Sequence, residues 1–334
     1  MSAGAVGAGA LTTLIAASLA GAAMGGPPRL ALPIDCTPGQ DCFVQNFVDR
    51  DPGPGAVDFL CGPLTYDGHK GTDIRLPSRA AMRAGVTVRA AAAGRVTAVR
   101  DGMADGDYLA GRAAAIEGRE CGNGVVIDHG DGWVTQYCHM KMGSILAQPG
   151  QRVEAGTPIG LVGLSGKTEF PHLHIAVRKD GAIVDPFDPD GGSCGTPAEG
   201  TLWLDAPPYV PGALLSAGVA TVVPDYESVR TGTPLPVERV VLAADAPAIV
   251  GWGFAFGVRK GDRMIFTIDA PSGRIFEHAL TLERPQAQAY RAAGRRAPAG
   301  GWPAGTYRVS VELRRGDQSL GRREITVEVT PRRP

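Results

Sequence analysis

Short strand-like segments separated by glycine and proline are the feature that most restricts the fold of this chain. The 334 residues include 47 glycines and 27 prolines, and long runs with a helical period are few. Glycine and proline mark turns and interrupt helices, whereas a strand needs only about four to eight residues between turns. The sequence therefore predicts a mostly β protein whose short strands are joined by turns.

Length and composition indicate two globular domains and disfavour one class of partner. A chain of 334 residues is longer than one compact core usually holds, so we expect two domains. Hydrophobic residues make up 44% and charged residues 20%, which are values of a globular chain. Because the formal net charge is -1 and no dense basic stripe is present, no nucleic-acid partner is expected.

Residues 1–26 are interpreted as an export signal or an apolar N-terminal tail. The stretch 5–23 is apolar or small throughout, and Ala20-Gly21-Ala22 has the form of a cleavage site. No Lys or Arg precedes Arg29, so an uncleaved tail remains the alternative. The abundance of Ala and Gly disfavours a spanning helix. We expect an exported protein, periplasmic or extracellular, with no stable membrane span after signal removal.

The rest of the chain divides into four parts by composition. Residues 27–60 are rich in Pro, Gly and Asp and are interpreted as an irregular N-terminal wrap. Residues 61–195 contain five of the six histidines and all the motif-like spacing. Residues 196–216 form a Pro-rich linker. Residues 217–334 predict a small β-sandwich of unknown role.

The sandwich prediction depends on about seven strand-like runs, by the criteria for short β segments. They are Val219–Val223, Arg239–Leu242, Ile249–Phe256, Arg263–Ile268, Arg274–Leu282, Gly305–Leu313 and Arg323–Val329. Trp252 is its candidate core aromatic residue. His278 is expected on the surface, because a lone histidine lacks partners for a metal site.

In the 61–195 region, strand-like runs surround a hairpin signal and a long loop. The runs are Val86–Val99, Gly124–His129, Trp133–His139, Pro158–Val162 and His172–Val177. Gly130-Asp131-Gly132 predicts a tight hairpin turn. Residues 101–120 predict a long polar loop, and such loops often serve as groove walls.

His69 and Asp73 supply an imidazole and a carboxylate, which are both good zinc ligands. Gly68, Gly71 and Pro77 favour a turn followed by a strand over a helix, and the glycines let the backbone bring both groups to one point. Taken alone, the pair is more typical of solvated loop residues.

His172 and His174 lie two residues apart in a predicted strand, so both imidazoles point to one face. Burying two unpaired imidazoles together is costly. A metal bound to one, with the other free for proton transfer, would account for the pattern. The alternative is an edge strand with two exposed histidines.

His139 follows the hairpin turn on the next strand. By strand alternation, Tyr137 and His139 share a face and Cys138 lies opposite. His129 stands at the hairpin end, where a histidine more often only hydrogen-bonds its loop.

Together these motifs resemble the lysostaphin-type, or LytM-like, zinc endopeptidases of peptidoglycan, over about a third of the chain and in the family's order. The matching elements are His69-x-x-x-Asp73, Val88 to Val96, Val126 to Gly132, Tyr137-x-His139, Val153 to Gly160, Gly163-x-Ser165-Gly166, His172-x-His174 and Asp185-Pro186.

The resemblance implies an antiparallel-sheet groove domain with one zinc ion per chain. His69, Asp73 and His174 would bind the zinc, and the fourth position would hold water. His139 and His172 would be the catalytic histidines: one would take a proton, and the other would stabilise the oxyanion or protonate the leaving amine. The substrate would be peptide bonds in peptidoglycan stems or cross-bridges.

Two other functions remain as alternatives. Some relatives are non-catalytic activators of a cell-wall amidase, and these typically lack a zinc ligand, whereas all the expected positions are filled here. A protein or glycan partner is the alternative role for the C-terminal domain, and it is compatible with catalysis.

Six cysteines favour disulfides after export, and none forms a C-x2-C pair. Pairing around the hairpin turn brings position 138 close to Cys121, and a bulge would close the remaining gap, so we predict Cys121–Cys138 on the face away from His139. Cys36 and Cys42 are near enough to close their own loop, which leaves Cys61–Cys194. Fifteen pairings of six cysteines exist.

Overall fold

The computed structural model describes residues 1, 26–106, 108, 111, 113–191, 194–195, 200–232 and 238–331. The apolar stretch 5–23, expected to be an export signal, lies outside these residues. Within the described ranges, none of the helices combines the length and apolarity needed to cross a bilayer.

In the part of the chain that the structure describes, an antiparallel sheet of eight strands forms the centre of the first domain. Its strands, in spatial order, are β1 (Phe43–Asn46), β2 (Thr72–Arg75), β9 (His172–Lys179), β6 (Trp133–Met140), β5 (Asn123–Gly130), β4 (Gly94–Arg100) and β7 (Arg152–Val153), with β10 (Ala182–Val184) paired to β9. A two-stranded sheet consists of β3 (Thr87–Arg89) and β8 (Pro158–Leu161). Two short helices accompany them, α1 (Arg79–Ala84) and α2 (Ala113–Ile116).

The period-2 patterns of the central strands explain which face is buried. On β9, Leu173 and Ile175 are 0% exposed and belong to the core of this domain. Ile175 lies opposite Tyr137 of β6, which is also in the core. Residues directly opposite each other share a face, so the histidines that alternate with these residues lie on the other face.

The hairpin between β5 and β6 forms at the predicted turn. Asp131 and Gly132 connect the strands, with φ angles of 49° and 77°. Positive φ at both central residues is what a two-residue turn with the right strand twist requires, and the Asp-Gly pair adopts it readily.

The segment 27–60 is not wholly irregular, in contrast to the sequence interpretation. Phe43–Asn46 forms β1, which pairs with β2 at the edge of the large sheet. Leu30 and Phe47 are 0% exposed and contribute to the core of the first domain. The segment was misinterpreted because its turn-forming residues outnumber the single short apolar run.

The second domain is a β-sandwich, as predicted. One sheet has the order β11 (Ala213–Ala220), β13 (Ala248–Val258) and β16 (Gln286–Arg296). The other has the order β12 (Arg239–Ala243), β18 (Gln318–Thr330), β17 (Gly305–Arg315), β14 (Arg263–Ala270) and β15 (Gly273–Thr281). Helix α3 (Tyr226–Thr231) follows β11. Residues from both sheets form one apolar core.

Two strand predictions are wrong in extent, and one strand was missed. β11 begins at Ala213, inside the predicted linker 196–216. β16 was not predicted, since its sequence QAQAYRAAGRR is rich in Ala and Arg, which are poor indicators of a strand. The run Val86–Val99 is two strands, β3 and β4, which belong to different sheets.

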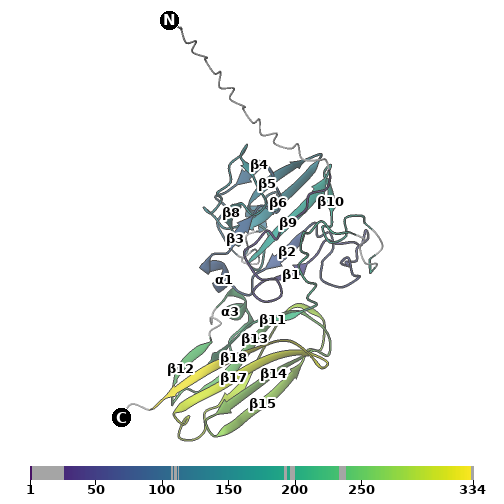
Figure 1. Cartoon of the computed structure of the whole chain (residues 1–334). Coiled ribbons are helices and arrows are strands. Elements are labelled where there is room, and N and C mark those ends of the chain that lie inside the picture. The colour runs from purple at the N-terminus through teal and green to yellow at the C-terminus, as the bar shows by residue number, and fades with distance from the viewer. Residues whose placement is uncertain are drawn as a thin grey trace.

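A separate apolar cluster joins the two domains, which lie end to end with α3 near the junction (Figure 1). It contains Phe43 of β1 together with Trp252, Phe254 and Phe256 of β13. The rings of Phe43 and Phe256 lie 5.4 Å apart. Trp252 is buried as expected, yet it belongs to this junction cluster and not to the sandwich core.

All three predicted disulfides are present: Cys36–Cys42, Cys61–Cys194 and Cys121–Cys138. The last has a Cα–Cα distance of 4.8 Å. The register between β5 and β6 shifts between the pairs Asn123–Met140 and Val125–Tyr137. Cys121 reaches Cys138 because the chain turns at Gly122, which has φ 67°, and the N–H of His139 donates to the carbonyl of Cys121 at 2.8 Å.

Candidate metal centre

Three side chains converge on one face of the large sheet. The Oδ1 atom of Asp73 lies 2.7 Å from Nδ1 of His174 and 3.2 Å from Nε2 of His69. The two ring nitrogens are 3.3 Å apart. These are the residues for which the sequence predicts zinc binding, and the fold brings together segments about 100 residues apart.

Strand pairing and one close approach position the three groups. Asp73 lies directly opposite His174 in the β2–β9 pair, so both side chains occupy the same face. His69 stands in the turn before β2. Gly71 sits between them, and a Cβ there would come within 2.6 Å of the His174 ring. Only glycine therefore fits this position.

The triangle of ligand atoms fits a tetrahedral zinc ion. With bonds of about 2.0–2.2 Å, ligand atoms of such a site lie about 3.3–3.6 Å apart. Nε2 of His69 lies 3.2 Å from Oδ1 of Asp73 and 3.3 Å from Nδ1 of His174, and both distances agree with this range within about 0.1 Å. The third, at 2.7 Å, is a hydrogen-bond distance that a cation would open. Two imidazoles and one carboxylate are also a donor set that zinc prefers in catalytic sites.

Neighbouring groups hold two of these side chains in a ligand orientation. Nδ1 of His69 donates to the backbone carbonyl of Phe47 at 2.6 Å, which leaves Nε2 directed at the centre. Asn46 donates from Nδ2 to Oδ2 of Asp73 at 2.8 Å. Such hydrogen bonds fix the tautomer and the ring or carboxylate orientation of a metal ligand.

The two predicted catalytic histidines lie beside this triangle. The ring of His139 is 4.7 Å from that of His172 and 5.9 Å from that of His174. His139 donates from Nδ1 to the carbonyl of Ser165 at 2.8 Å, and His172 from Nδ1 to the carbonyl of Phe170 at 2.9 Å. In each ring the other nitrogen, Nε2, is directed to the centre, and Nε2 of His172 lies 3.4 Å from Oδ1 of Asp73.

A β-bulge, and not regular alternation, aims His139 at the centre. Cys138 lies opposite His174, so by the pairing rule Cys138 shares the face of the centre while Tyr137 faces the core. Alternation would then place His139 with Tyr137 in the core. His139 instead has φ 61° and joins the histidines. The predicted faces of Tyr137, Cys138 and the disulfide were thus wrong, because a bulge re-aims one side chain.

Asp73 and His139 both have pKa values well below their usual ones, for different reasons. Burial raises the pKa of Asp73, but the charges of His69 and His172 outweigh it and hold that pKa well below its usual value. For His139, burial and then the charges of His172 and His174 hold the pKa well below its usual value. Asp73 is therefore ionised and His139 neutral near pH 7.

The pKa shifts of the two candidate histidine ligands have opposite directions. Burial lowers the pKa of His69, but the carboxylate of Asp73 outweighs burial and leaves that pKa raised. For His174, burial exceeds the effect of Asp73, and the pKa is lowered. Neutral imidazole is the form that binds metal, and a cation in the triangle would favour it in both rings.

A cavity of about 430 Å³ opens over these side chains. Its lining includes Asp73, His139, His172 and His174, together with Tyr66 and Tyr108. It also includes Ala287 and Gln288, which come from β16 of the sandwich. The C-terminal domain therefore forms part of the wall around the candidate site.

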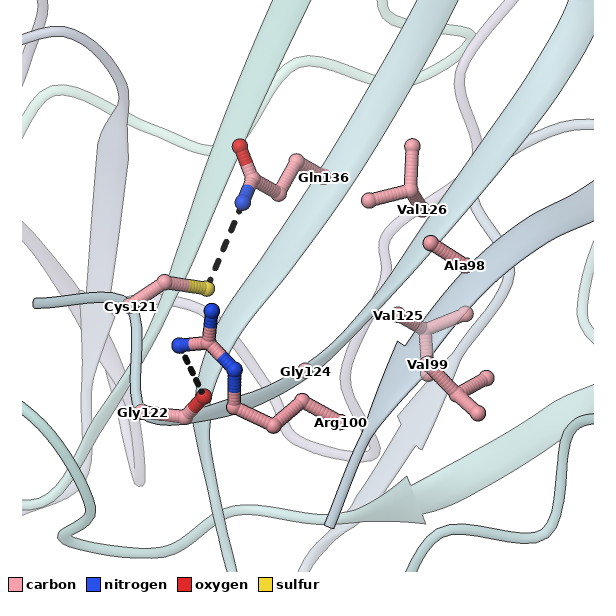
Figure 2. Close-up of a pocket in the computed structure, with 9 residues that line it drawn as sticks. All are labelled: Ala98, Val99, Arg100, Cys121, Gly122, Gly124, Val125, Val126 and Gln136. Atoms are coloured by element: carbon pink, nitrogen blue, oxygen red, sulfur yellow. Dashed lines mark hydrogen bonds between the residues drawn. The ribbon is translucent and has the colours of Figure 1, made fainter. Parts of the chain in front are cut away.

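Another hollow, of about 140 Å³, lies on the sheet near Cys121 (Figure 2). Ala98, Val99, Val125 and Val126 line it, and Arg100 donates to the carbonyl of Gly122 at its rim. Its lining contains no histidine or carboxylate, so it offers no ligand set for a catalytic metal.

The remaining histidines behave as predicted. His129 contacts the carbonyl of Ala93 at 2.7 Å through Nδ1 and the hydroxyl of Thr135 at 2.8 Å through Nε2, so both ring nitrogens are used structurally. His278 is exposed on β15.

Sequence reasoning missed the residues that support the centre from β1 and β16. Asn46 and the carbonyl of Phe47 belong to the segment interpreted as an irregular wrap. The adjacent Phe43 and Val44, which are residue types enriched in strands, were the available signal for a strand. For Gln288, nothing local indicated a place beside the histidines.

Comparison with known proteins agrees with this geometry. Residues 67–186 match the model of peptidase family M23. The peptidoglycan DD-endopeptidase ShyA of Vibrio cholerae is 37% identical over 81 residues, which are 23% of this chain and 18% of ShyA. The murein hydrolase activator EnvC of Escherichia coli is 34% identical over 103 residues, which are 30% of this chain and 22% of EnvC.

The matched segments are thus less than a quarter of these two relatives. Among solved structures, a point mutant of the catalytic domain of the prophage-encoded M23 protein EnpA from Enterococcus faecalis is similar with a TM-score of 0.31 and 25% identity. The similarity covers 44% of this chain and 90% of that domain.

Proposed function

We propose that this protein is an exported zinc endopeptidase that hydrolyses peptide bonds in the stems or cross-bridges of peptidoglycan. The observation that carries the proposal is the convergence of a zinc-fitting triangle and two further histidines in one cavity. The match to peptidase family M23 and the similarity to an enzyme named as a peptidoglycan endopeptidase support the substrate class.

The residues of this chain divide the work of hydrolysis between them. His69, Asp73 and His174 would hold one zinc ion, which when bound supplies Lewis acidity and lowers the pKa of water. His139, held neutral by burial, accepts the proton of the attacking water at Nε2. His172, which as an imidazolium carries a proton on Nε2, then stabilises the oxyanion or protonates the leaving amine, and the proton held by His139 replaces the one that His172 gives up.

Three disulfides support an exported location, periplasmic or extracellular, since such bonds persist in oxidising compartments.

The second candidate function is a non-catalytic activator of a cell-wall amidase, favoured by the similarity to EnvC. The complete set of ligands and catalytic histidines favours hydrolysis over activation.

Digestion of purified peptidoglycan, followed by mass spectrometry of the released fragments, tests the proposal. The wild type should contain about one zinc per chain and release peptides cut within stems or cross-bridges. Asp73→Ala and His174→Ala should lose the zinc and about 10³-fold or more of the activity, because zinc supplies several kcal/mol of charge stabilisation.

His278→Ala is the matched control and should behave as the wild type, because the ring is exposed and remote in the sandwich. A folded, zinc-loaded wild type that releases no peptide, yet stimulates a purified amidase, would replace the enzyme proposal with the activator.

A further inference from the structure

The candidate site does not end at the peptidase domain. A second cavity of about 490 Å³ lies between the domains. It shares four lining residues with the cavity over the histidines: Gln45, Asn46, Thr65 and Ala287. The two cavities are therefore adjacent along the domain junction, and together they are called the interdomain cleft.

The far part of this cleft is formed largely by the sandwich. Its lining there includes the segment Gly257–Lys260, which follows the body of β13, and Pro285 to Ala287, which begin β16. These two segments are adjacent, because Val258 pairs with Gln286. From the first domain, Pro63 and Leu64 complete the wall.

The charges of the far part are all positive. Arg259 and Lys260 line it and are exposed, and its lining contains no carboxylate. The acid nearest in sequence, Asp262, is 1% exposed and is held by two contacts to the guanidinium of Arg315, at 2.9 and 2.8 Å. The charge of Asp262 is therefore already paired, and the two cations face the cleft without it.

A hydrogen-bond acceptor that needs a donor lies in the part of the cleft over the histidines. The side-chain oxygen of Gln288 is buried and has no hydrogen-bond partner among the residues that the structure describes. Gln288 lines the cavity over the histidines. A buried amide oxygen without a donor is unfavourable, and a bound peptide has backbone N–H groups that could supply one.

The junction that forms the cleft is built to keep its shape. The buried guanidinium of Arg75 donates to Oε1 of Gln45 and lies 4.3 Å from the ring centroid of Phe170. From the sandwich, Arg230 donates to the carbonyl of Glu169 at 2.9 Å. Together with the apolar cluster around Phe43, these contacts hold the sandwich wall against the site.

We propose that the interdomain cleft is a substrate subsite, in which Arg259 and Lys260 bind a carboxylate of an acidic peptide whose scissile bond lies over the histidines. The inference rests on the proposed function and assigns to the C-terminal domain the selection of substrates by charge. Gln288 is the positioning residue between the two parts of the cleft.

The test compares two synthetic peptides that differ only in one group remote from the scissile bond, a free carboxylate or its amide. The variant R259E/K260E reverses both charges. R263E/R296E is the control, because it makes the same change in net charge at exposed arginines of the sandwich outside both cavities.

With zinc-loaded protein, R259E/K260E should lower kcat/KM for the carboxylate peptide about tenfold or more, since exposed charge pairs contribute modestly and reversal adds repulsion. The amide peptide should change less than about twofold, and the wild-type preference should weaken with salt. Equal losses for the two peptides, or no loss, would overturn the proposal.

A wild type that cuts neither peptide would count against the proposed function and not against the subsite. The subsite is then judged by calorimetric titration of the same peptides into the zinc-loaded proteins. Wild type and R263E/R296E should bind the carboxylate peptide more tightly than the amide, and R259E/K260E should not. Absence of any difference in the wild type refutes the subsite.

Gln288→Ala tests the positioning residue separately. It should raise KM for both peptides by about three- to tenfold, the worth of about one hydrogen bond, with kcat and Tm unchanged. A lower Tm with unchanged KM would show that Gln288 has only a structural role.

Discussion

Strands β9 and β13 are both apolar on the face toward their own core, and they differ in what the opposite face carries. On β9, Leu173 and Ile175 fill the core while His172 and His174 face the cavity. The polar face of this strand is the centre of the candidate active site.

On β13, the opposite face carries aromatic rings. Gly251 and Gly253 face the sandwich core, where added Cβ atoms would meet Val309 and Met264. The alternate residues Trp252, Phe254 and Phe256 form the junction with the first domain. Both faces of β13 are therefore buried, although the strand belongs to an antiparallel sheet that would otherwise have a solvated face.

The comparison shows that the second face of a strand decides its role in this protein. A face of imidazoles indicates chemistry, because such groups are costly to bury without a purpose. A face of large aromatic rings indicates an attachment surface, because exposed patches of that kind are unfavourable. Four predictions test this difference between the candidate site and the domain junction.

The largest effect is expected from the two proposed catalytic histidines. His172→Ala on β9 and His139→Ala on the adjacent β6 should each keep zinc and lose about 10²–10⁴-fold in kcat, because general acid–base groups contribute that much. Metal analysis and turnover on peptidoglycan fragments measure the two properties. Loss of zinc with activity restored by added metal would instead make the residue a ligand.

The next effect belongs to the aromatic face of β13. Phe254→Ala should lower the free energy of unfolding by about 3–5 kcal/mol, the usual cost of removing a buried phenylalanine side chain. Denaturant unfolding measures it. Val241→Ala is the control, since Val241 is 64% exposed, and it should change stability by less than about 0.5 kcal/mol. Equal effects of the two changes would contradict a buried junction.

A pH effect on stability is expected from Asp185, which lies shortly before the segment that leads from the first domain to the sandwich. Burial raises the pKa of Asp185 to about 6. Between the unfolded pKa near 4 and this value the folded state binds more protons than the unfolded state, so this carboxyl makes stability fall as pH rises through about 4 to 6.

Asp185→Asn should remove that dependence, because Asn keeps the acceptor for the N–H of Phe187 without a charge. The Tm difference between variant and wild type should grow in favour of the variant from pH 4 to pH 7, by the equivalent of up to about 3 kcal/mol. A difference that is constant across this range would show that Asp185 is not protonated in the folded protein.

The smallest effect is expected from the support of the centre. Asn46→Ala removes the donor to Oδ2 of Asp73 and should weaken zinc binding about 10–100-fold, with the fold retained. Competition with a zinc chelator measures the affinity. Gln40→Ala, in the loop before β1, is the control and should leave the affinity unchanged, since this residue lines neither cavity of the cleft.

The sequence by itself determined the features that depend on neighbouring residues. Alternation in the central strands, the Asp-Gly turn of the β5–β6 hairpin and the short loop of Cys36–Cys42 are local, and all were predicted. The set of five site residues was predicted from motifs in a family's order, and His172 and His174 also from their spacing on one strand.

Only the tertiary structure decided how these residues are aimed and enclosed. The bulge at His139 reverses the face that alternation predicts, and the support from Asn46 requires β1 to reach the sheet edge. Gln288 reaches the cavity because the aromatic face of β13 packs on Phe43, more than 200 residues earlier in the chain. Such contacts depend on how distant segments pack, and local sequence patterns carry no record of them.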